Sequence, residues 1–249
     1  MIGLFDPRCA GFTLEGTGDD GVVLIHGFTG APTHFRLMAE ALNRSGFTVV
    51  APLLAGHGTS VEDMATTGAA DWLDSAREAI TSVRDRRSIH LVGLSMGGLL
   101  GLLLAGPSGA ATVTTINSPI RFRDRSIHLT PLAHRFSPRV ERPMDTPPPF
   151  DSEADGLWLT YEGFPTRAAA DLLRLSRTAL RAARRLRRPT LVVQSRADEA
   201  VNPVSGEILA RALGPQSRLL WLERSRHNAL LDVERDIIHA AVLDLIGAT

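Results

Sequence analysis

Ser-Ile-His-Leu-Val-Gly-Leu-Ser-Met-Gly-Gly-Leu-Leu, residues 88–100, is the stretch that decides the fold of this chain. Its first half is a short apolar run, typical of a strand buried on both faces. The leucine-rich segment that follows predicts a buried helix. Between the two, Gly93–Gly97 fits the pattern Gly-x-Ser-x-Gly, a sharp strand-to-helix turn with Ser95 at its tip.

The spacing of this motif has a physical reason. A serine at the tip of so sharp a turn has strained backbone angles, and glycines two residues before and after it remove Cβ atoms that would collide. The hydroxyl is then exposed at a helix N-terminus, where backbone N–H groups favour developing negative charge. The alternative is a glycine-rich turn of an α/β protein without any such chemistry.

The composition of the chain indicates one large globular core. It has 249 residues, 44% of them apolar and 22% charged, with a formal net charge of zero. This length suits one α/β domain or one domain with an insertion. All 27 basic residues are arginine, and 27 acidic residues balance them, so we expect no nucleic-acid partner.

Targeting and membrane signals are not visible in the sequence. Residues 1–7 have neither the basic nor the apolar region of a signal peptide. The longest apolar run, residues 99–105, is too short to span a bilayer, which takes about 20 residues. Cys9 is alone, so disulfides do not stabilise the fold. We expect a cytoplasmic protein without an integral membrane segment, as a monomer or homodimer.

Strands and helices alternate along most of the chain. Strands are predicted at residues 10–14, 21–26, 47–51, 88–94, 111–116, 190–194 and 217–222. Helices are predicted at 33–44, 69–85, 95–106, 166–188, 203–213 and 228–246. This alternation predicts a mostly parallel sheet with helices on both faces.

One segment departs from this alternation. Residues 119–165 contain eight of the 15 prolines, and six arginines lie between Arg121 and Arg142. Neither a strand period nor a helix period holds across the segment. With the helix at 166–188, it predicts an insertion over 119–188 in a core made of 1–118 and 189–249.

A serine nucleophile needs a base, and the base needs a third group to orient it. For a serine in this motif, an acid and then a histidine follow later in the chain, each after a strand. Asp198 follows the strand at 190–194, and His227 follows the strand at 217–222. Glu199 is the alternative acid, and Asp198 could instead cap the helix after Pro203. His227 could simply begin the last helix.

Acyl attack also needs donors for the oxyanion that forms. One is expected from the N–H of Met96, the residue after the serine, and the other from Phe28 in the loop after an earlier strand. His26 is interpreted as a residue that packs this loop. His57 has no partner at zinc spacing, so no metal and no cofactor are predicted.

Several of these motifs together resemble a known family. Leu24–Gly30, Gly56-His57-Gly58 and Gly93–Gly98, with Asp198 and His227, resemble bacterial carboxylesterases and monoacylglycerol lipases of the α/β-hydrolase superfamily. The resemblance implies an α/β-hydrolase fold, with Ser95, Asp198 and His227 as the catalytic triad and Phe28 and Met96 as the oxyanion hole. It also implies that the insertion 119–188 is a cap over the site.

The resulting hypothesis is a cofactor-independent serine hydrolase that cleaves carboxylic esters of short to medium acyl chain, as a carboxylesterase or monoacylglycerol lipase does. Its partner is then a small-molecule ester. The alternative that keeps the triad is a thioesterase or acyltransferase, in which the arginines from Arg121 to Arg142 attract a coenzyme A phosphate. A ligand-binding protein without catalysis is the alternative of another class.

Overall fold

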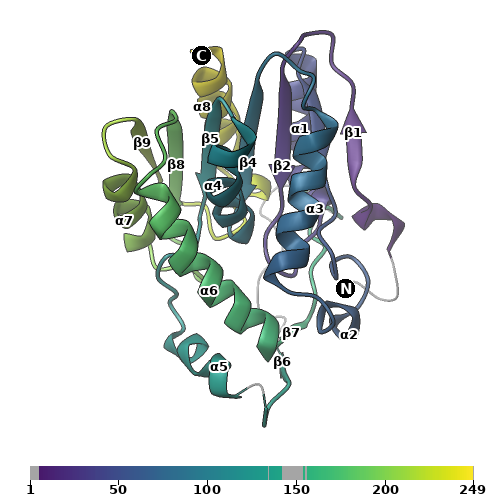
Figure 1. Cartoon of the computed structure of the whole chain (residues 1–249), viewed down its shortest axis with the longest axis vertical. Coiled ribbons are helices and arrows are strands. Elements are labelled where there is room, and N and C mark those ends of the chain that lie inside the picture. The colour runs from purple at the N-terminus through teal and green to yellow at the C-terminus, as the bar shows by residue number, and fades with distance from the viewer. Residues whose placement is uncertain (1–5, 134, 142–153, 155, 249) are drawn as a thin grey trace.

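The structure, a computed structural model, describes residues 6–133, 135–141, 154 and 156–248. Its centre is a seven-stranded sheet (Figure 1). In spatial order the strands are β1 (Phe12–Leu14), β3 (Thr48–Ala51), β2 (Gly21–Ile25), β4 (Ile89–Leu94), β5 (Thr112–Ile116), β8 (Thr190–Ser195) and β9 (Ser217–Leu222). β1 runs antiparallel to β3, and every other pair in this sheet is parallel. The predicted sheet is confirmed.

The central strands are apolar on both faces. In β2, Val23 and Ile25 belong to the hydrophobic cluster on one face, whereas Val22 and Leu24 belong to the cluster on the other. All five residues of this strand are buried. Continuous apolar runs therefore form these strands because helices cover both sides of the sheet.

Helices form a layer on each face (Figure 1). α1 (Arg36–Arg44) and α8 (Arg235–Gly247) cover one face. α3 (Ala69–Ser82), α4 (Met96–Ser108) and α7 (Val204–Leu213) cover the other, and α6 (Thr166–Ala183) packs against α4. Among the described residues, no helix is both long and apolar enough to cross a membrane.

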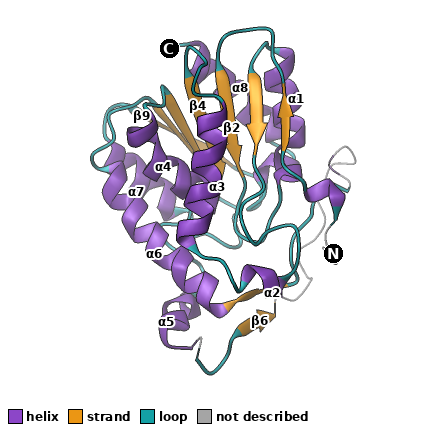
Figure 2. Cartoon of the chain, turned by 45° about the vertical axis from the view of Figure 1, so that its right-hand side comes forward, coloured by secondary structure: helices purple, strands orange, loops and turns teal. Residues whose placement is uncertain are grey.

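The segment between β5 and α6 lies below the carboxyl edge of the sheet (Figure 2). It contains the 3₁₀-helix η3 (Arg125–Leu129), α5 (Thr130–Ala133), and an antiparallel pair of strands, β6 (Arg139–Glu141) and β7 (Gly163–Pro165). α2 (Val61–Met64) packs against β7. These elements are three to five residues long, too short to leave a period in the sequence. Arg142 and the prolines at 147–149 of the proline-rich segment lie outside the described residues.

The insertion boundary at residues 119 and 188 stays a prediction. α6 contacts both parts of the molecule: it packs along α4, and it also contacts η3, α5 and β7. We use "cap" below for the described residues from 119 to 165.

The C-terminal helix begins later than predicted. A helix was expected over 228–246, but the chain forms a 3₁₀-turn, η5 (Ala229–Leu231), and α8 begins only at Arg235. Asp232 and Glu234 explain this difference, because their carboxylates accept hydrogen bonds from backbone N–H groups of the preceding loop, at Arg226 and Glu223. These side chains stabilise a loop where the apolar pattern alone favours a helix. Other element ends differ from the predictions by a few residues, as the 3₁₀-helix η2 (Pro32–Phe35) before α1 illustrates.

Candidate active site

Ser95 stands on the turn between β4 and α4 with φ of 53° and ψ of −118°, a conformation that non-glycine residues rarely adopt. The neighbouring glycines make this turn possible. A Cβ on Gly97 would collide with the carbonyl group of Ile25, and a Cβ on Gly93 would collide with the backbone of Gly97. The motif glycines are therefore required by close backbone approach, as the spacing predicts.

Hydrogen bonds to the end of β5 hold the turn in place. The backbone N–H of Ser95 donates to the carbonyl oxygen of Ile116 at 2.7 Å, and the Ser118 hydroxyl donates to the carbonyl oxygen of Ser95 at 3.0 Å. The Ser95 residue is 7% exposed, and it lines a cavity. A serine fixed in this way can present its hydroxyl to a bound molecule.

Asp198 follows β8 and is fully buried. Its Oδ1 atom accepts backbone N–H groups from Ala200 at 2.9 Å and Val201 at 2.7 Å. Its Oδ2 atom lies 2.9 Å from Nδ1 of His227. The turn that these amides form orients the carboxylate toward the imidazole, so Asp198 does not cap the helix after Pro203.

Glu199, the alternative acid, also contacts His227, but at a different atom. Its Oε2 accepts the backbone N–H of His227 at 3.0 Å. Glu199 is exposed to solvent, whereas Asp198 is buried. Asp198 therefore contacts the imidazole ring, and Glu199 contacts the main chain of the same residue.

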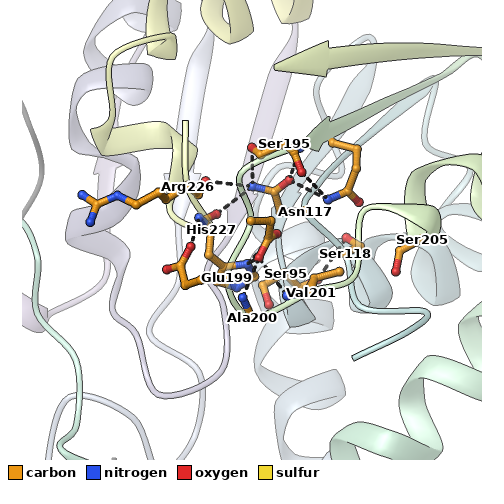
Figure 3. Close-up of polar contacts among 12 residues, drawn as sticks. Ser95, Asn117, Ser118, Ser195, Glu199, Ala200, Val201, Ser205, Arg226 and His227 are labelled. Atoms are coloured by element: carbon orange, nitrogen blue, oxygen red, sulfur yellow. Dashed lines mark hydrogen bonds and ion pairs between the residues drawn. The ribbon is translucent and has the colours of Figure 1, made fainter. Parts of the chain in front are cut away.

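His227 lies in the loop after β9, and its side chain is 23% exposed. Ser95 and His227 line the same cavity and belong to one cluster of side chains (Figure 3). Because Nδ1 donates to a carboxylate, the neutral ring leaves Nε2 as the basic nitrogen. The structure thus brings together a hydroxyl, an imidazole and a carboxylate from three loops that are far apart in the chain.

The cavity has a volume of about 460 Å³ and lies between the sheet edge and the cap. The cap contributes apolar side chains to its wall, among them Ile127, Val140, Trp158 and Phe164. The Phe28 ring packs edge-to-face on Phe164, with their centroids 5.6 Å apart. The wall thus suits an apolar group that lies against the serine.

The backbone N–H groups of Phe28 and Met96 are candidate anion donors. Met96 is the first residue of α4, so its N–H has no partner within the helix. Gly27 lies against the serine, since a Cβ built on it would stand 3.2 Å from the Cβ of Ser95. In the described part of the chain, neither N–H donates to a protein acceptor. The two donors could therefore bind an oxyanion beside Ser95.

Two buried histidines stabilise the loops near the site. Nε2 of His26 accepts the backbone N–H of Leu54 at 3.1 Å, so His26 packs its loop as predicted. Burial lowers the pKa of His57 to about 4, and its Nδ1 donates to the carbonyl oxygen of Ala55. Among the described residues, no cluster of three or more potential metal ligands occurs.

Sequence reasoning missed two groups that shape this site. Glu234 is buried, which by itself raises the pKa of its carboxyl. It also accepts the backbone N–H groups of Glu223, Arg224 and Ser225, and these bonds lower the pKa below its ordinary value. Asn117, at the end of β5, donates to the carbonyl oxygen of His227. An acid ten residues after the loop it stabilises gives no recognisable sequence signal, whereas an Asn directly after a buried strand could have been noted.

Comparisons with known proteins agree with this architecture. A model of the alpha/beta hydrolase family matches residues 22–240, and the chain belongs to this family. The chain is 32% identical to a thermostable monoacylglycerol lipase from Bacillus sp. (strain H-257), over 89% of this chain and 88% of the relative. It is 27% identical to a carboxylesterase from Bacillus subtilis (strain 168), over 94% of this chain and 95% of that protein.

Solved structures of lipolytic enzymes have a similar fold. A structure from work on LipS and LipT, two metagenome-derived lipolytic enzymes, superimposes with a TM-score of 0.87 at 31% identity, covering 99% of this chain and 100% of that one. The monoacylglycerol lipase of Paleococcus ferrophilus has a TM-score of 0.79 at 18% identity, over 96% of this chain and 99% of that chain. At 18% identity, the similarity to the Paleococcus ferrophilus enzyme shows a shared fold only.

Proposed function

We propose that this protein cleaves carboxylic esters of short to medium acyl chain, monoacylglycerols among them, through an acyl-enzyme on Ser95. The chain is a carboxylic ester hydrolase, in keeping with its lipase and carboxylesterase relatives. The observation that carries the mechanism is the 2.9 Å contact of Asp198 with Nδ1 of His227, in a cavity that Ser95 also lines.

In this mechanism His227 is the base. Asp198 accepts the Nδ1–H, which leaves Nε2 free to take the proton of the Ser95 hydroxyl as Oγ attacks the ester carbonyl. The tetrahedral intermediate collapses, the bond to the alkoxy group breaks, and the imidazolium gives its proton to the leaving alcohol. A water molecule then attacks the acyl-enzyme with His227 again as base, which releases the carboxylic acid and restores Ser95.

The negative charge of the intermediate falls on the former carbonyl oxygen. The N–H groups of Phe28 and Met96 are proposed to bind it, and the positive end of the α4 dipole lies at the same point. Both donors are fixed by backbone packing before substrate arrives. They therefore stabilise the charge without reorganisation in the transition state.

The cavity wall favours an uncharged substrate. The acidic residues Asp124, Glu141 and Glu199 line it, and no arginine does among the described residues. Arg139 instead pairs with two carboxylates, those of Glu62 and Glu141. These observations do not support the alternative in which the arginines from Arg121 to Arg142 bind a coenzyme A phosphate.

A panel of esters tests the proposal. Nitrophenyl esters of graded acyl length, a monoacylglycerol and butyryl-coenzyme A are compared, and a fluorophosphonate probe is used to label the serine. We expect turnover of the esters, slow turnover of the thioester, and labelling that Ser95→Ala abolishes. The base acts as a neutral imidazole, so kcat/KM should rise with pH through an apparent pKa of about 6–7. Labelling that persists in Ser95→Ala would assign the nucleophile elsewhere.

A further inference from the structure

Asn117 directly follows β5, beside β8, the strand that precedes Asp198, and it is close to the loop that carries His227 (Figure 3). The residue is fully buried and has φ of 47°, in the left-handed region. Asparagine and glycine are the residues that most readily adopt this conformation. A buried polar side chain in such a conformation needs hydrogen-bond partners, and the Asn117 side chain makes five hydrogen bonds within the described part of the chain.

The two ends of its side-chain amide bind two different loops. Its Oδ1 accepts the backbone N–H of Ser195 at 2.7 Å and Nε2 of Gln194 at 3.2 Å. Its Nδ2 donates to the carbonyl oxygens of His227 at 2.8 Å and Arg226 at 3.3 Å, and to Oγ of Ser195 at 2.9 Å. The partners fix the orientation of the amide, because a backbone N–H must face oxygen and two carbonyl groups must face nitrogen.

The amide therefore connects the end of β8 to the main chain of His227. Ser195 lies three residues before Asp198, the carboxylate that contacts the imidazole. The rest of the His227 loop is fixed from other directions, by Glu199 at the His227 N–H and by Asp232 at the Arg226 N–H. On the carbonyl side of His227, Asn117 supplies the side-chain contact.

We propose that Asn117 is a positioning residue, which sets the distance and orientation of the His227 imidazole relative to the Asp198 carboxylate. The inference rests on the proposed role of these two residues in ester hydrolysis. The loops that carry His227 and Asp198 follow different strands. A buried amide that binds both loops holds them at a fixed distance from each other when substrate enters the cavity. A displacement of about 1 Å in such a group can cost on the order of 10²-fold in rate.

Two substitutions and a control test the proposal. Asn117→Asp retains an acceptor for the Ser195 N–H but places an oxygen against the two carbonyl groups. Asn117→Gly keeps the left-handed backbone available and removes the side chain. Thr115→Val is the control, because Thr115 is fully buried on the same strand and its hydroxyl has no hydrogen-bond partner among the described residues.

We expect kcat on a short nitrophenyl ester to fall about 100-fold in Asn117→Asp and Asn117→Gly, with KM within about threefold of the parent. Thr115→Val should keep both constants. In Asn117→Gly the apparent pKa of the acidic limb of kcat/KM should also fall, because a looser contact with Asp198 stabilises the protonated imidazole less. Circular dichroism at the assay temperature establishes that each variant is folded.

A kcat within twofold of the parent in folded Asn117→Asp and Asn117→Gly would overturn the positioning role. So would a loss of kcat in Asn117→Gly with an unchanged acidic limb, since that result indicates a general structural effect. Ser95→Ala separates this failure from failure of the proposed function. If Ser95→Ala is inactive while the Asn117 variants are fully active, only the inference about Asn117 is wrong.

Discussion

The carboxyl edge of the sheet and the cap that faces it are built by different physical means. At the sheet edge, parallel strands end together, and main-chain hydrogen bonds fix Ser95 and Asp198. The cap consists of short elements, and three of its apolar side chains, those of Leu129, Leu132 and Phe136, are largely exposed. Buried backbone contacts therefore determine the chemistry on one side of the cavity, while side chains of short elements line the other.

This contrast implies that the sheet edge determines the rate of the reaction and the cap determines which substrate is preferred. Changes at the sheet edge should reduce turnover of every ester by a similar factor, because in the proposed mechanism they act on the reacting atoms. Changes in the cap should alter which ester is preferred, because cap residues such as Ile127 and Phe164 line the cavity. The predictions below test this difference, starting from the largest expected effect.

Replacing Ser95, the proposed nucleophile, should have the largest effect. Ser95→Ala is expected to lower kcat on the order of 10⁶-fold for all esters, by analogy with other serine triads. Ser108→Ala, a change at the far end of α4, is the control and should keep kcat. A loss below tenfold in Ser95→Ala, measured with a nitrophenyl ester, would contradict the proposed mechanism.

The two neighbouring acids should differ strongly. Asp198→Asn is expected to lower kcat about 10⁴-fold, because an amide does not stabilise the imidazolium or select its tautomer. Glu199→Gln keeps an oxygen that can accept the His227 N–H, and should cost less than tenfold. Steady-state kinetics on one ester compare the two variants. Equal losses would mean that the buried contact at Nδ1 has no special role.

A cap substitution should change substrate preference rather than chemistry. Ile127→Trp adds volume to the cavity wall on η3, and we expect kcat/KM to fall about tenfold for long acyl esters and to change little for acetate. Leu129→Trp is the matched control on the same 3₁₀-helix, because Leu129 is 64% exposed and does not line the cavity. A uniform loss across the ester panel would show that the cap acts on the chemistry.

Buried histidines should give the smallest effect, on stability rather than rate. Burial lowers the pKa of both His34 and His57 to about 4, against an unfolded value of 6.5. Between these values the unfolded chain binds more protons than the native one, so the free energy of unfolding falls as pH decreases from 6.5 toward 4. For each histidine, the free energy of unfolding changes by at most about 1.4 kcal/mol per pH unit.

Urea unfolding between pH 7.5 and 5.0 measures this slope. His57→Gln removes one of the titrating groups and should flatten the dependence of stability on pH. An unchanged slope in that variant would assign the acid sensitivity to other residues.

Local signals explain why the core could be predicted from the sequence. The strand at Gly21–Ile25 and the turn at Ser95 follow from apolar runs and glycine spacing, which report burial and steric limits within a few residues. The start of α8 was predicted wrongly, because Glu234 and Asp232 stabilise a loop through contacts with residues 223–226. The β6–β7 pair was missed because its strands are three residues long and 21 residues apart.

By itself the sequence determined the alternation of strands and helices, the serine turn, and the order in which hydroxyl, carboxylate and imidazole occur. Each strand, helix and turn among these follows from residues within one segment, and their order can be read directly along the chain. Only the tertiary structure decided which acid contacts the His227 ring and that Asn117 connects the two loops. It also decided that, among the described residues, acidic residues and no arginine line the cavity. These features depend on distances between segments that lie tens of residues apart, and such distances exist only once the sheet has formed.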